Sequence, residues 1–432
     1  ELERLLPHVE AAQRRVPGLE RCGIKDIVNG PIAYTPDGSP LVGPAWGVKN
    51  LWINEGHSFG ITAAGGAGWQ LAEWIVEGEP GIDMLAVDPR RFGGYTSKRY
   101  LVAKNEEAYR DVFTIHYPDE ERHDARPVKT SPVYDKLRRL GAVFGQRYGW
   151  ERANWFAPEG VEPKDVWSFR RTNYFEHVGN ECRRLREKVG VIDLTPFTKF
   201  EVTGPGAEGW LDSLVANKVP TKVGRIALCH ALTQRGGIRS EFTITKLADH
   251  HYYVVSAGAA ERYDADFLQK RLPTDGSVTL RNITGSRGVF VLAGPRARDV
   301  MAKLTDVPLD NASFPWLTGQ VIEAGLATDV YALRVNFVGA LGWELHFPIE
   351  YAHGLFDAIF AAGAEHGIGM AGMRAMESLR MEKSYRMWGS DLTRDNTPLE
   401  GGLARFVRMD KGPFTGREAL ERIQGLGELY SA

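Results

Sequence analysis

Two glutamates stand in settings that suit chemistry on a nitrogen atom. Glu241 comes shortly after the pair Gly236-Gly237 and begins an alternating, strand-like run. A carboxylate there can take a proton from an attacking N–H group and stabilise a nearby cation. Glu344 lies on another alternating run, so its side chain is expected to point away from that of Trp343. A carboxylate in that position can accept two adjacent N–H donors as a charge-assisted pair.

A charged helix is predicted over residues 373–387. Its charged residues are Arg374, Glu377, Arg380, Glu382 and Arg386. Most of them are expected to form surface pairs three or four residues apart. Trp388 follows the predicted helix and offers a flat aromatic face to a ring-shaped ligand, although a buried core position fits it equally well.

A glycine-rich segment, residues 55–68, precedes a helical pattern that begins at Trp69. A glycine-rich turn that leads into a helix exposes backbone N–H groups at the positive end of the helix dipole. Such a turn suits an anionic or hydrogen-bond-accepting group. Close packing of a strand against a helix explains the same glycines about as well.

The elements that must position these residues alternate along the chain. Helices are expected at 176–189, 207–214 and 353–366, and strands at 198–203, 252–256, 288–295 and 331–337. Further upstream, residues 34–43 carry a hairpin signal and residues 51–54 read as a strand, whereas residues 117–127 read as a loop. Strands and helices mixed in this way, with several antiparallel returns, predict an α+β fold.

Composition narrows the class of protein. A chain of 432 residues predicts two or three domains. Its formal charge is -2 and no basic block occurs, so no nucleic-acid partner is expected. Neither a membrane-spanning apolar stretch nor a signal peptide is visible, and three scattered cysteines favour a reducing compartment without a disulfide or a metal site. The expected location is cytoplasmic, or the mitochondrial matrix in a eukaryote. No hydrolase motif occurs.

The segments around Glu241, Glu344 and residues 377–391 resemble, in order and spacing, a known folate-binding module. The glycine-cleavage aminomethyltransferases share this module with the dimethylglycine and sarcosine dehydrogenases. The resemblance implies that tetrahydrofolate is bound by Glu344, Trp388 and Arg374, and that Glu241 is the catalytic carboxylate.

Four positions depart from the aminomethyltransferase pattern. Glu241 stands where those enzymes have an aspartate, which favours the dehydrogenase branch, and Ser240 stands where they often have another acid. Ala340 replaces a glutamate, and Met376 replaces an arginine that contacts folate, two positions away from Arg374. The roles of those two family residues are therefore unfilled here.

Residues 30–92 are similar to the C-terminal end of the flavin domain in D-amino-acid-oxidase-like oxidoreductases. The resemblance implies that the glycine-rich turn closes over FAD, with contacts at Gly56, His57, Gly60 and Ile61. The dinucleotide fingerprint Gly-x-Gly-x-x-Gly does not occur. We therefore expect a chain that depends on a missing flavin-domain segment or on a partner chain, with apolar side chains such as Leu51, Ile53 and Ile61 exposed toward it.

The expected domains are therefore residues 1–93 as part of a flavin domain, residues 94–160 as a connector, and residues 161–432 as the folate-binding domain without the C-terminal barrel of the family. The resemblance implies oxidative N-demethylation of a small methylated amine, with the one-carbon unit passed to tetrahydrofolate. The electron acceptor would be an electron-transfer flavoprotein or oxygen. Two alternatives stay open: a flavin-independent folate-dependent transferase, and a non-catalytic folate-binding subunit.

Overall fold

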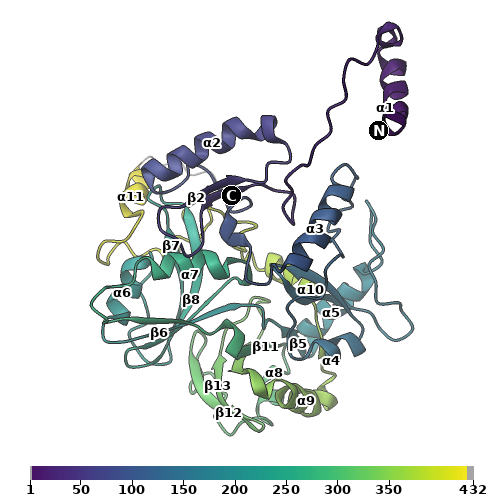
Figure 1. Cartoon of the computed structure of the whole chain (residues 1–432). Helices are drawn as coiled ribbons and strands as arrows, with labels where there is room; N and C mark the ends of the chain where they lie inside the picture. The colour runs from purple at the N-terminus through teal and green to yellow at the C-terminus, as the bar shows by residue number, and fades with distance from the viewer. Residues whose placement is uncertain (1, 426–432) are drawn as a thin grey trace.

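The computed structural model describes residues 2–425, and two β-sheets form its centre (Figure 1). The strands of the first sheet are β6 (Thr198–Thr203), β7 (Ile226–Leu232), β8 (Ile238–Ala248), β9 (His251–Ser256) and β10 (Thr279–Asn282). The strands of the second are β5 (Gly190–Asp193), β11 (Arg287–Ala293), β12 (Gly319–Ala324), β13 (Ala327–Leu333), β14 (Gly342–Pro348) and β15 (Gly369–Met370).

The first sheet has the order β10-β6-β9-β8-β7, and the second has the order β12-β13-β14-β11-β5-β15. Their neighbouring strands run antiparallel, except for β15, which pairs with β5 in parallel. Apolar residues at every second position give strands such as β8 a buried face, whereas β11 is buried at every position. The prediction of an α+β fold is confirmed.

Helices cover the outer face of the first sheet and parts of both faces of the second. They are α5 (Phe175–Glu187), α6 (Ala207–Leu214), α7 (Glu261–Gln269), α8 (Ala297–Met301), α9 (Ala352–Gly363) and α10 (Met373–Glu382). Helices α6 and α7 pack on the first sheet, where Trp210 and Phe267 join the cluster around Phe242. Helices α8 and α9 pack on one face of the second sheet, whereas α5 and α10 pack on the other. Figure 1 shows α9 along the lower edge.

The two sheets meet each other through their remaining faces. Ile226, Tyr253 and Val255 from the first sheet form one apolar cluster with Tyr331 and Leu333 from the second. Burial of these side chains fixes how the two sheets are placed, because each buried large apolar side chain contributes roughly 1.5–3 kcal/mol. Residues on these inner faces are therefore held in a defined geometry.

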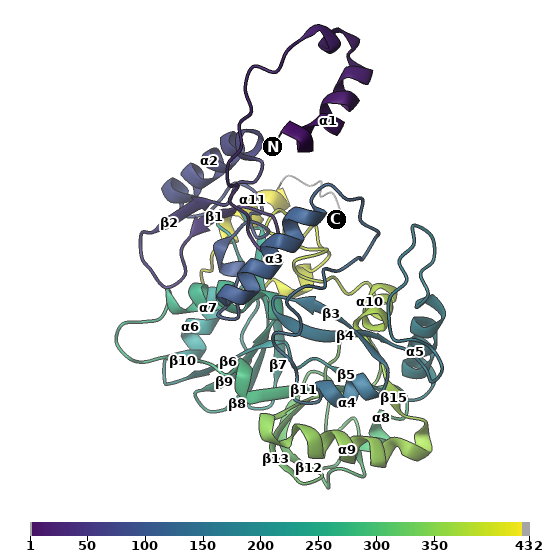
Figure 2. The ribbon, with the colours of Figure 1, turned by 45° about the vertical axis from the view of Figure 1, so that its right-hand side comes forward.

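The N-terminal part is a smaller layer. The hairpin β1 (Leu41–Pro44) and β2 (Trp52–Glu55) packs with α2 (Gly60–Glu77) through Val42 and Trp74. Helix α1 (Leu2–Arg15) stands apart from the rest of the molecule in both views (Figure 2).

The segment predicted as a connector is folded over much of its length. It contains α3 (Lys98–Asp111), α4 (Tyr134–Arg139) and the hairpin of β3 (Ala142–Arg147) and β4 (Trp150–Phe156), and α11 (Arg417–Gly425) closes the described chain. Short 3-10 turns lie at Pro17–Arg21, Pro89–Arg91, Gly258–Ala260, Thr284–Ser286, Ile349–Tyr351, Ala364–His366 and Ala404–Phe406. The predicted domain bounds at 93 and 160 stay predictions.

Three element boundaries predicted from the sequence are wrong. Helix α2 begins at Gly60 rather than at Trp69, so the glycines at 65, 66 and 68 lie inside a helix instead of a turn. Its buried Trp74 anchors it to the hairpin, and that packing outweighs the low helix propensity of glycine. Helix α10 ends at Glu382, since the chain turns at Ser384, whose φ is 54°. Strand β13 ends at Leu333 rather than continuing to 337.

Within residues 2–425, no helix is both long enough and apolar enough to cross a membrane. Over the same residues, no group of three metal-ligating side chains occurs. The three cysteines are free. The predicted exposure of apolar side chains near the N-terminus is found at Leu51, which is 49% exposed, and at Ile61, which is fully exposed, whereas Ile53 is half-buried.

Candidate functional site

Glu241 is paired with a buried histidine on the neighbouring strand. Residues 230 and 241 lie directly opposite each other in the antiparallel ladder of β7 and β8. The His230 Nε2 atom lies 3.0 Å from Glu241 Oε2. The His230 side chain is fully buried, whereas 24% of the Glu241 side chain is exposed. The Glu241 carboxylate is therefore held by the buried His230 and is partly open to the solvent.

Alternation along β8 explains why the neighbour of Glu241 is not an acid. Ser240 points to the opposite face, where its Oγ donates to Asp264 Oδ1 at 2.6 Å. Burial raises the pKa of Asp264 to about 6. A carboxylate at position 240 would face that buried acid, and two adjacent carboxylates repel each other. A serine, which can donate a hydrogen bond, suits the position.

Glu344 lies on the inner face of the second sheet between two apolar residues. On β14 it faces Val291 of β11 on one side and Leu333 of β13 on the other. Only 8% of the residue is exposed, and this burial raises the pKa of its carboxyl to about 8. Trp343 points the other way and packs on Phe314, as the alternating pattern predicts. Burial therefore favours the protonated form of Glu344 near neutral pH.

A second buried histidine stands behind Glu344. His346, two residues further along the same face of β14, places Nε2 3.2 Å from Glu344 Oε2. Its Nδ1 atom lies 2.9 Å from the hydroxyl of Tyr253, which belongs to β9 of the other sheet. Burial lowers the pKa of His346 and raises that of Tyr253, so the imidazole and the phenol are both neutral. The chain Tyr253–His346–Glu344 thus joins the two sheets.

Trp388 packs beside the strand that carries Glu241. It is 9% exposed and shares an apolar cluster with Leu232 and Ile238, at the turn between β7 and β8. Its ring centroid lies 6.2 Å from that of Tyr263. The indole Nε1 is buried and has no hydrogen-bond partner among the described residues. The tryptophan is thus largely a core residue with one donor left to satisfy.

Arg374 lies at the start of α10 and contacts the segment that precedes the two sheets. Its Nη1 atom lies 3.1 Å from Asp119 Oδ2 and 2.9 Å from the hydroxyl of Tyr174. No hydrogen bond, ion pair or ring contact within residues 2–425 joins it to Glu241 or Glu344. Its Nε atom is buried and lacks a partner in the described part of the chain. Met376, at the position where the family has arginine, is 3% exposed and belongs to the core.

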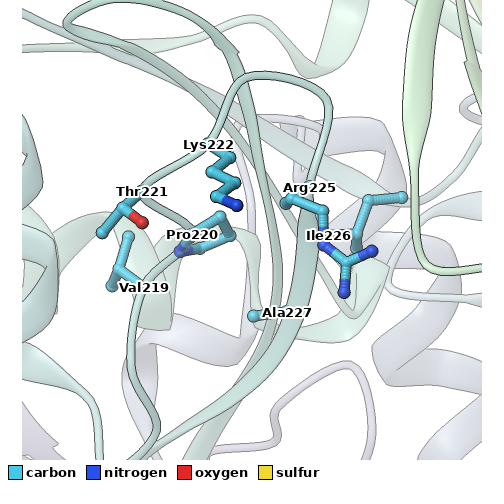
Figure 3. Close-up of a pocket in the computed structure, with 7 residues that line it drawn as sticks. All are labelled: Val219, Pro220, Thr221, Lys222, Arg225, Ile226 and Ala227. Atoms are coloured by element: carbon cyan, nitrogen blue, oxygen red, sulfur yellow. The ribbon is translucent and has the colours of Figure 1, made fainter.

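The surface hollows of the described residues include two beside the strands of the two sheets. One, of about 270 Å³, lies at the start of β14 and is lined by residues that include Trp316, Arg334, Gly342 and Tyr385. Of these, Gly342 lies two residues before Glu344 on the same strand. The other, of about 440 Å³, is lined by residues 219–222 and 225–227 before and within β7 (Figure 3). None of the predicted site residues lines either hollow. Of these two, the hollow beside β14 is the one lined in part by the strand that carries Glu344.

The four predicted FAD-contacting residues lie at or just before the start of α2, whereas the two acids lie on β8 and β14. Gly56 has a φ of 72°, and a Cβ atom there would come within 2.7 Å of Thr35 Cγ2, so the turn requires glycine. His57 Nε2 lies 2.6 Å from Asn54 Oδ1, and its Nδ1 is buried without a partner in the described chain. Gly60 begins the helix and Ile61 is fully exposed. A ring lying over Ile61 would find an apolar contact beside the N-terminus of α2.

Sequence reasoning missed the two histidines and Tyr253. His346 could have been found, because position i+2 on a strand shares the face of position i, and the run Glu-Leu-His is visible in the sequence. His230 lies opposite Glu241 only through a hairpin register with a bulge between Ala231 and Leu232. Tyr253 reaches His346 across 93 residues by sheet-on-sheet packing, which leaves no local signal.

The fold and the matching family models define the class: an aminomethyltransferase-like domain preceded by portions of flavin oxidoreductase domains. The model of the GCVT N-terminal domain matches residues 133–411, that of the FAD dependent oxidoreductase central domain matches 77–131, and that of the FAD dependent oxidoreductase matches 1–74. The chain belongs to the GCVT family, in the branch that carries flavin oxidoreductase segments. The resemblance drawn from the sequence is confirmed.

Individual proteins agree with this assignment. The chain is 39% identical over 429 residues to the mitochondrial dimethylglycine dehydrogenase of Rattus norvegicus, covering 99% of this chain and 50% of the relative. It is 33% identical over 462 residues to the mitochondrial sarcosine dehydrogenase of Homo sapiens, covering 97% of this chain and 50% of the relative. The chain therefore spans about half the length of these relatives.

One solved structure supports the fold of the larger part. The crystal structure of the glycine cleavage system aminomethyltransferase T from Bartonella henselae superposes with a TM-score of 0.58 at 25% identity. The superposition covers 69% of this chain and 75% of that one.

Proposed function

We propose that this chain takes part in the oxidative N-demethylation of a small methylated amine, such as dimethylglycine or sarcosine, and passes the one-carbon unit to tetrahydrofolate as 5,10-methylenetetrahydrofolate. The observation that carries the proposal is Glu344: a buried carboxyl whose burial raises its pKa to about 8, held by His346 on one oxygen. An acid kept in an apolar setting suits a ligand edge that brings two N–H donors. The ring edge of a pterin has that pattern.

The second acid fits the transfer step. Glu241 is partly exposed and lies within hydrogen-bonding distance of His230. Its carboxylate can take the proton of the attacking folate N–H group and can stabilise the iminium cation that the folate attacks. Holding acceptor and iminium together away from water limits hydrolysis to formaldehyde. Glu241 is the proposed catalytic residue, and Glu344, Trp388 and Arg374 are the proposed folate contacts.

The flavin part of the proposal is supported by the start of α2. Gly56 offers a tight turn, and His57 offers a buried nitrogen that has no partner among the described residues. Gly60 and Ile61 offer a helix N-terminus and an apolar contact. These features fit the rim of an isoalloxazine ring. FAD, when bound, would supply the hydride acceptor for oxidation of the N-methyl group.

The proposed partners follow from the same region. Exposed apolar side chains on α2 include Trp69, which is 66% exposed, and Val76, which is 78% exposed. A flavin-domain segment or a partner chain would cover them. The electron acceptor is proposed to be an electron-transfer flavoprotein or oxygen. Since the rat and human relatives are named mitochondrial, a mitochondrial matrix location is proposed for a eukaryotic source and a cytoplasmic one otherwise.

The test is a titration of the chain with tetrahydrofolate under anaerobic conditions. Glu344→Gln keeps the shape of the side chain but turns one acceptor oxygen toward the ligand into a donor. Leaving a buried donor unpaired costs about 1–3 kcal/mol, so the Kd should rise about 5- to 150-fold. The matched control is Glu181→Gln, which changes another buried acid whose carboxylate accepts from the backbone of Phe156 and Gly372. Equal affinity in the Glu344→Gln variant and the original chain would refute the folate site.

A second measurement separates the alternatives. The intact protein should show the yellow absorption of oxidised flavin and should lose it when the amine is added. A folate-binding protein without any flavin in the presence of its partner would instead be a flavin-independent transferase. Folate binding without turnover of either half would indicate a non-catalytic subunit.

A further inference from the structure

Tyr253, His346 and Glu344 form a continuous polar line inside an otherwise apolar interface. Tyr253 and His346 are both fully buried, and Glu344 is 8% exposed. The line crosses from β9 of the first sheet to β14 of the second, with 2.9 Å between the Tyr253 hydroxyl and His346 Nδ1 and 3.2 Å between His346 Nε2 and Glu344 Oε2. It is flanked by Val291 and Leu333 on the neighbouring strands.

The direction of the hydrogen bonds in this line follows from the tyrosine. Its hydroxyl has no second partner in the part of the chain that the structure describes. If His346 Nδ1–H donated to Tyr253, the phenolic hydrogen would be buried without an acceptor, at a cost of about 1–3 kcal/mol. Tyr253 therefore donates to Nδ1, which leaves the proton of the neutral imidazole on Nε2. His346 in turn donates to Glu344 Oε2.

The result is that the two oxygens of Glu344 are unequal. Oε2 accepts from His346 whatever the charge of the carboxyl. In the free protein the acidic proton is therefore carried by Oε1. A ligand edge with two N–H donors requires both oxygens as acceptors, and it can bind well only after that proton has left.

The charged groups around the line bear on the same equilibrium. From β11, Arg287 places Nη1 3.4 Å from the His346 carbonyl and is paired with Asp329. From β6, Lys199 is fully buried, with Nζ donating to the carbonyls of Thr195 and Arg287, and burial lowers its pKa to about 7. Tyr331 of β13 lies opposite His346. Arg287, and Lys199 when it is protonated, favour a neutral His346, which keeps the direction of the line unchanged.

We propose that His346 and Tyr253 are positioning residues for ligand binding at Glu344. They keep Oε2 as a hydrogen-bond acceptor and confine the exchangeable proton to Oε1. Binding of a pterin therefore releases one proton to the solvent. The proposal rests on the proposed folate site. Its consequence is a pH-dependent affinity. With the pKa of the free carboxyl at about 8, affinity rises about tenfold for each pH unit up to about 8 and then levels off.

The experiment is isothermal titration calorimetry of the full chain with 5-formyltetrahydrofolate, which resists oxidation, at half-unit steps from about pH 6 to about pH 9, a range that spans the carboxyl pKa of about 8. At neutral pH, two buffers with different ionisation enthalpies give the number of protons released. We expect close to one proton there and none at the alkaline end. His346→Phe removes the donor to Oε2, so the midpoint of the affinity profile should move up by about one pH unit. His346→Gln restores an N–H donor and should return the midpoint most of the way.

Tyr253→Phe supplies a milder variant, since it deletes one oxygen and keeps the ring. It should shift the midpoint in the same direction by a smaller amount. The matched control is Tyr252→Phe, the neighbouring residue on β9. Its hydroxyl is also buried and bonded, to Glu208 and the Pro220 carbonyl, but on the opposite face of the sheet. A general effect of losing a buried hydroxyl would appear in both variants, whereas the proposed effect appears in Tyr253→Phe alone.

Two failures are distinguishable. If Glu344→Gln binds the ligand as the original chain does, the folate site itself is refuted. If Glu344→Gln weakens binding but a folded His346→Phe variant keeps the original midpoint and proton count, the folate site stands and the positioning role is overturned. Equal shifts of the profile in Tyr252→Phe and Tyr253→Phe would overturn the positioning role as well.

Discussion

The two acid–histidine pairs differ in what lies behind the histidine. In both pairs, Nε2 of a fully buried histidine lies within hydrogen-bonding distance of a glutamate oxygen. The distance is 3.0 Å for His230–Glu241 and 3.2 Å for His346–Glu344. The Nδ1 atom of His346 accepts from Tyr253, whereas that of His230 has no partner in the described residues. Exposure differs too, at 24% for the Glu241 side chain and 10% for that of Glu344.

The surroundings of the two glutamates suit them to different tasks. A carboxyl that holds a ligand benefits from a fixed tautomer behind it and from low polarity around it, as at Glu344. A carboxylate that exchanges protons with a reacting group benefits from access to the ligand and to solvent, as at Glu241. The same two residue types thus suit binding in one sheet and proton transfer in the other.

We expect the greatest loss of activity when Glu241 is replaced. In the intact, flavin-loaded protein, Glu241→Gln should slow transfer of the one-carbon unit to folate by about 10²–10⁴-fold, because the general base is lost. Flavin reduction by the amine should stay nearly unchanged, and released formaldehyde should rise. Stopped-flow absorbance and a formaldehyde assay measure the two halves separately.

Glu201→Gln is the matched control for that variant. Glu201 bonds His251 across neighbouring strands of the same sheet, also at 3.0 Å, and its side chain is 21% exposed. A loss of transfer in both variants would mean that any histidine–glutamate pair in this sheet matters for folding. Loss of flavin reduction in Glu241→Gln, with normal capture for each amine oxidised, would reverse the assigned division of labour.

The second prediction tests the pair at Glu344 through stability. The pKa of this carboxyl is raised from its usual 4.5 to about 8 by burial, so the folded state binds the proton more tightly than the unfolded state between those values. The free energy of unfolding should therefore fall as pH rises from about 4.5 to about 8. Glu344→Gln carries no such proton, so its stability relative to the original chain should increase with pH over that window.

Urea unfolding at about pH 5, 6.5 and 8, within that window, measures this difference. Comparing the variant with the original chain removes the contribution of Glu181, whose pKa burial raises to about 7. A stability difference that does not change with pH would show that Glu344 is charged in the folded protein. The effect assigned to the low polarity around Glu344 would then be wrong.

The third prediction concerns the histidine behind Glu241. A proton on His230 Nδ1 would face no acceptor in the described chain, so Nε2–H donates to Glu241. His230→Leu removes this charge-assisted hydrogen bond and should slow one-carbon transfer about tenfold. His230→Gln keeps a donor and should recover part of the rate. A purely structural role would lower stability in both variants while leaving the rate of the folded fraction unchanged.

The sequence predicts the acids better than their surroundings, for physical reasons. Alternation along single strands places Trp343 and Glu344 on opposite faces and Ser240 away from Glu241, because strand geometry is local. Helix ends are predicted less well: the glycines at 65–68 indicate a turn, but packing of Trp74 on the β1–β2 hairpin makes them helical.

The residues behind the acids depend on longer-range contacts. The position of His230 depends on a bulged hairpin register, and the bond from Tyr253 to His346 depends on how two sheets pack. No pattern within either segment encodes that contact. The charge state of a buried acid cannot be predicted from its own segment either. The raised pKa of Glu344 comes from burial between Val291 and Leu333, which lie on two other strands.

The smallest expected effect concerns Arg374, the predicted folate contact that belongs to neither pair. Its Nη1 atom is already engaged by Asp119 and Tyr174, so a ligand can gain only its remaining donors, of which Nε is buried and unpaired in the described chain. One such hydrogen bond is worth about 1 kcal/mol, so Arg374→Lys should weaken folate binding no more than about fivefold. Stability should change by less than about 1 kcal/mol, because Asp119 is largely exposed. A drop in affinity as large as that of Glu344→Gln would mean that a cation anchors the folate as firmly as the buried acid does, and the contrast between the two sheets would then describe only part of the site.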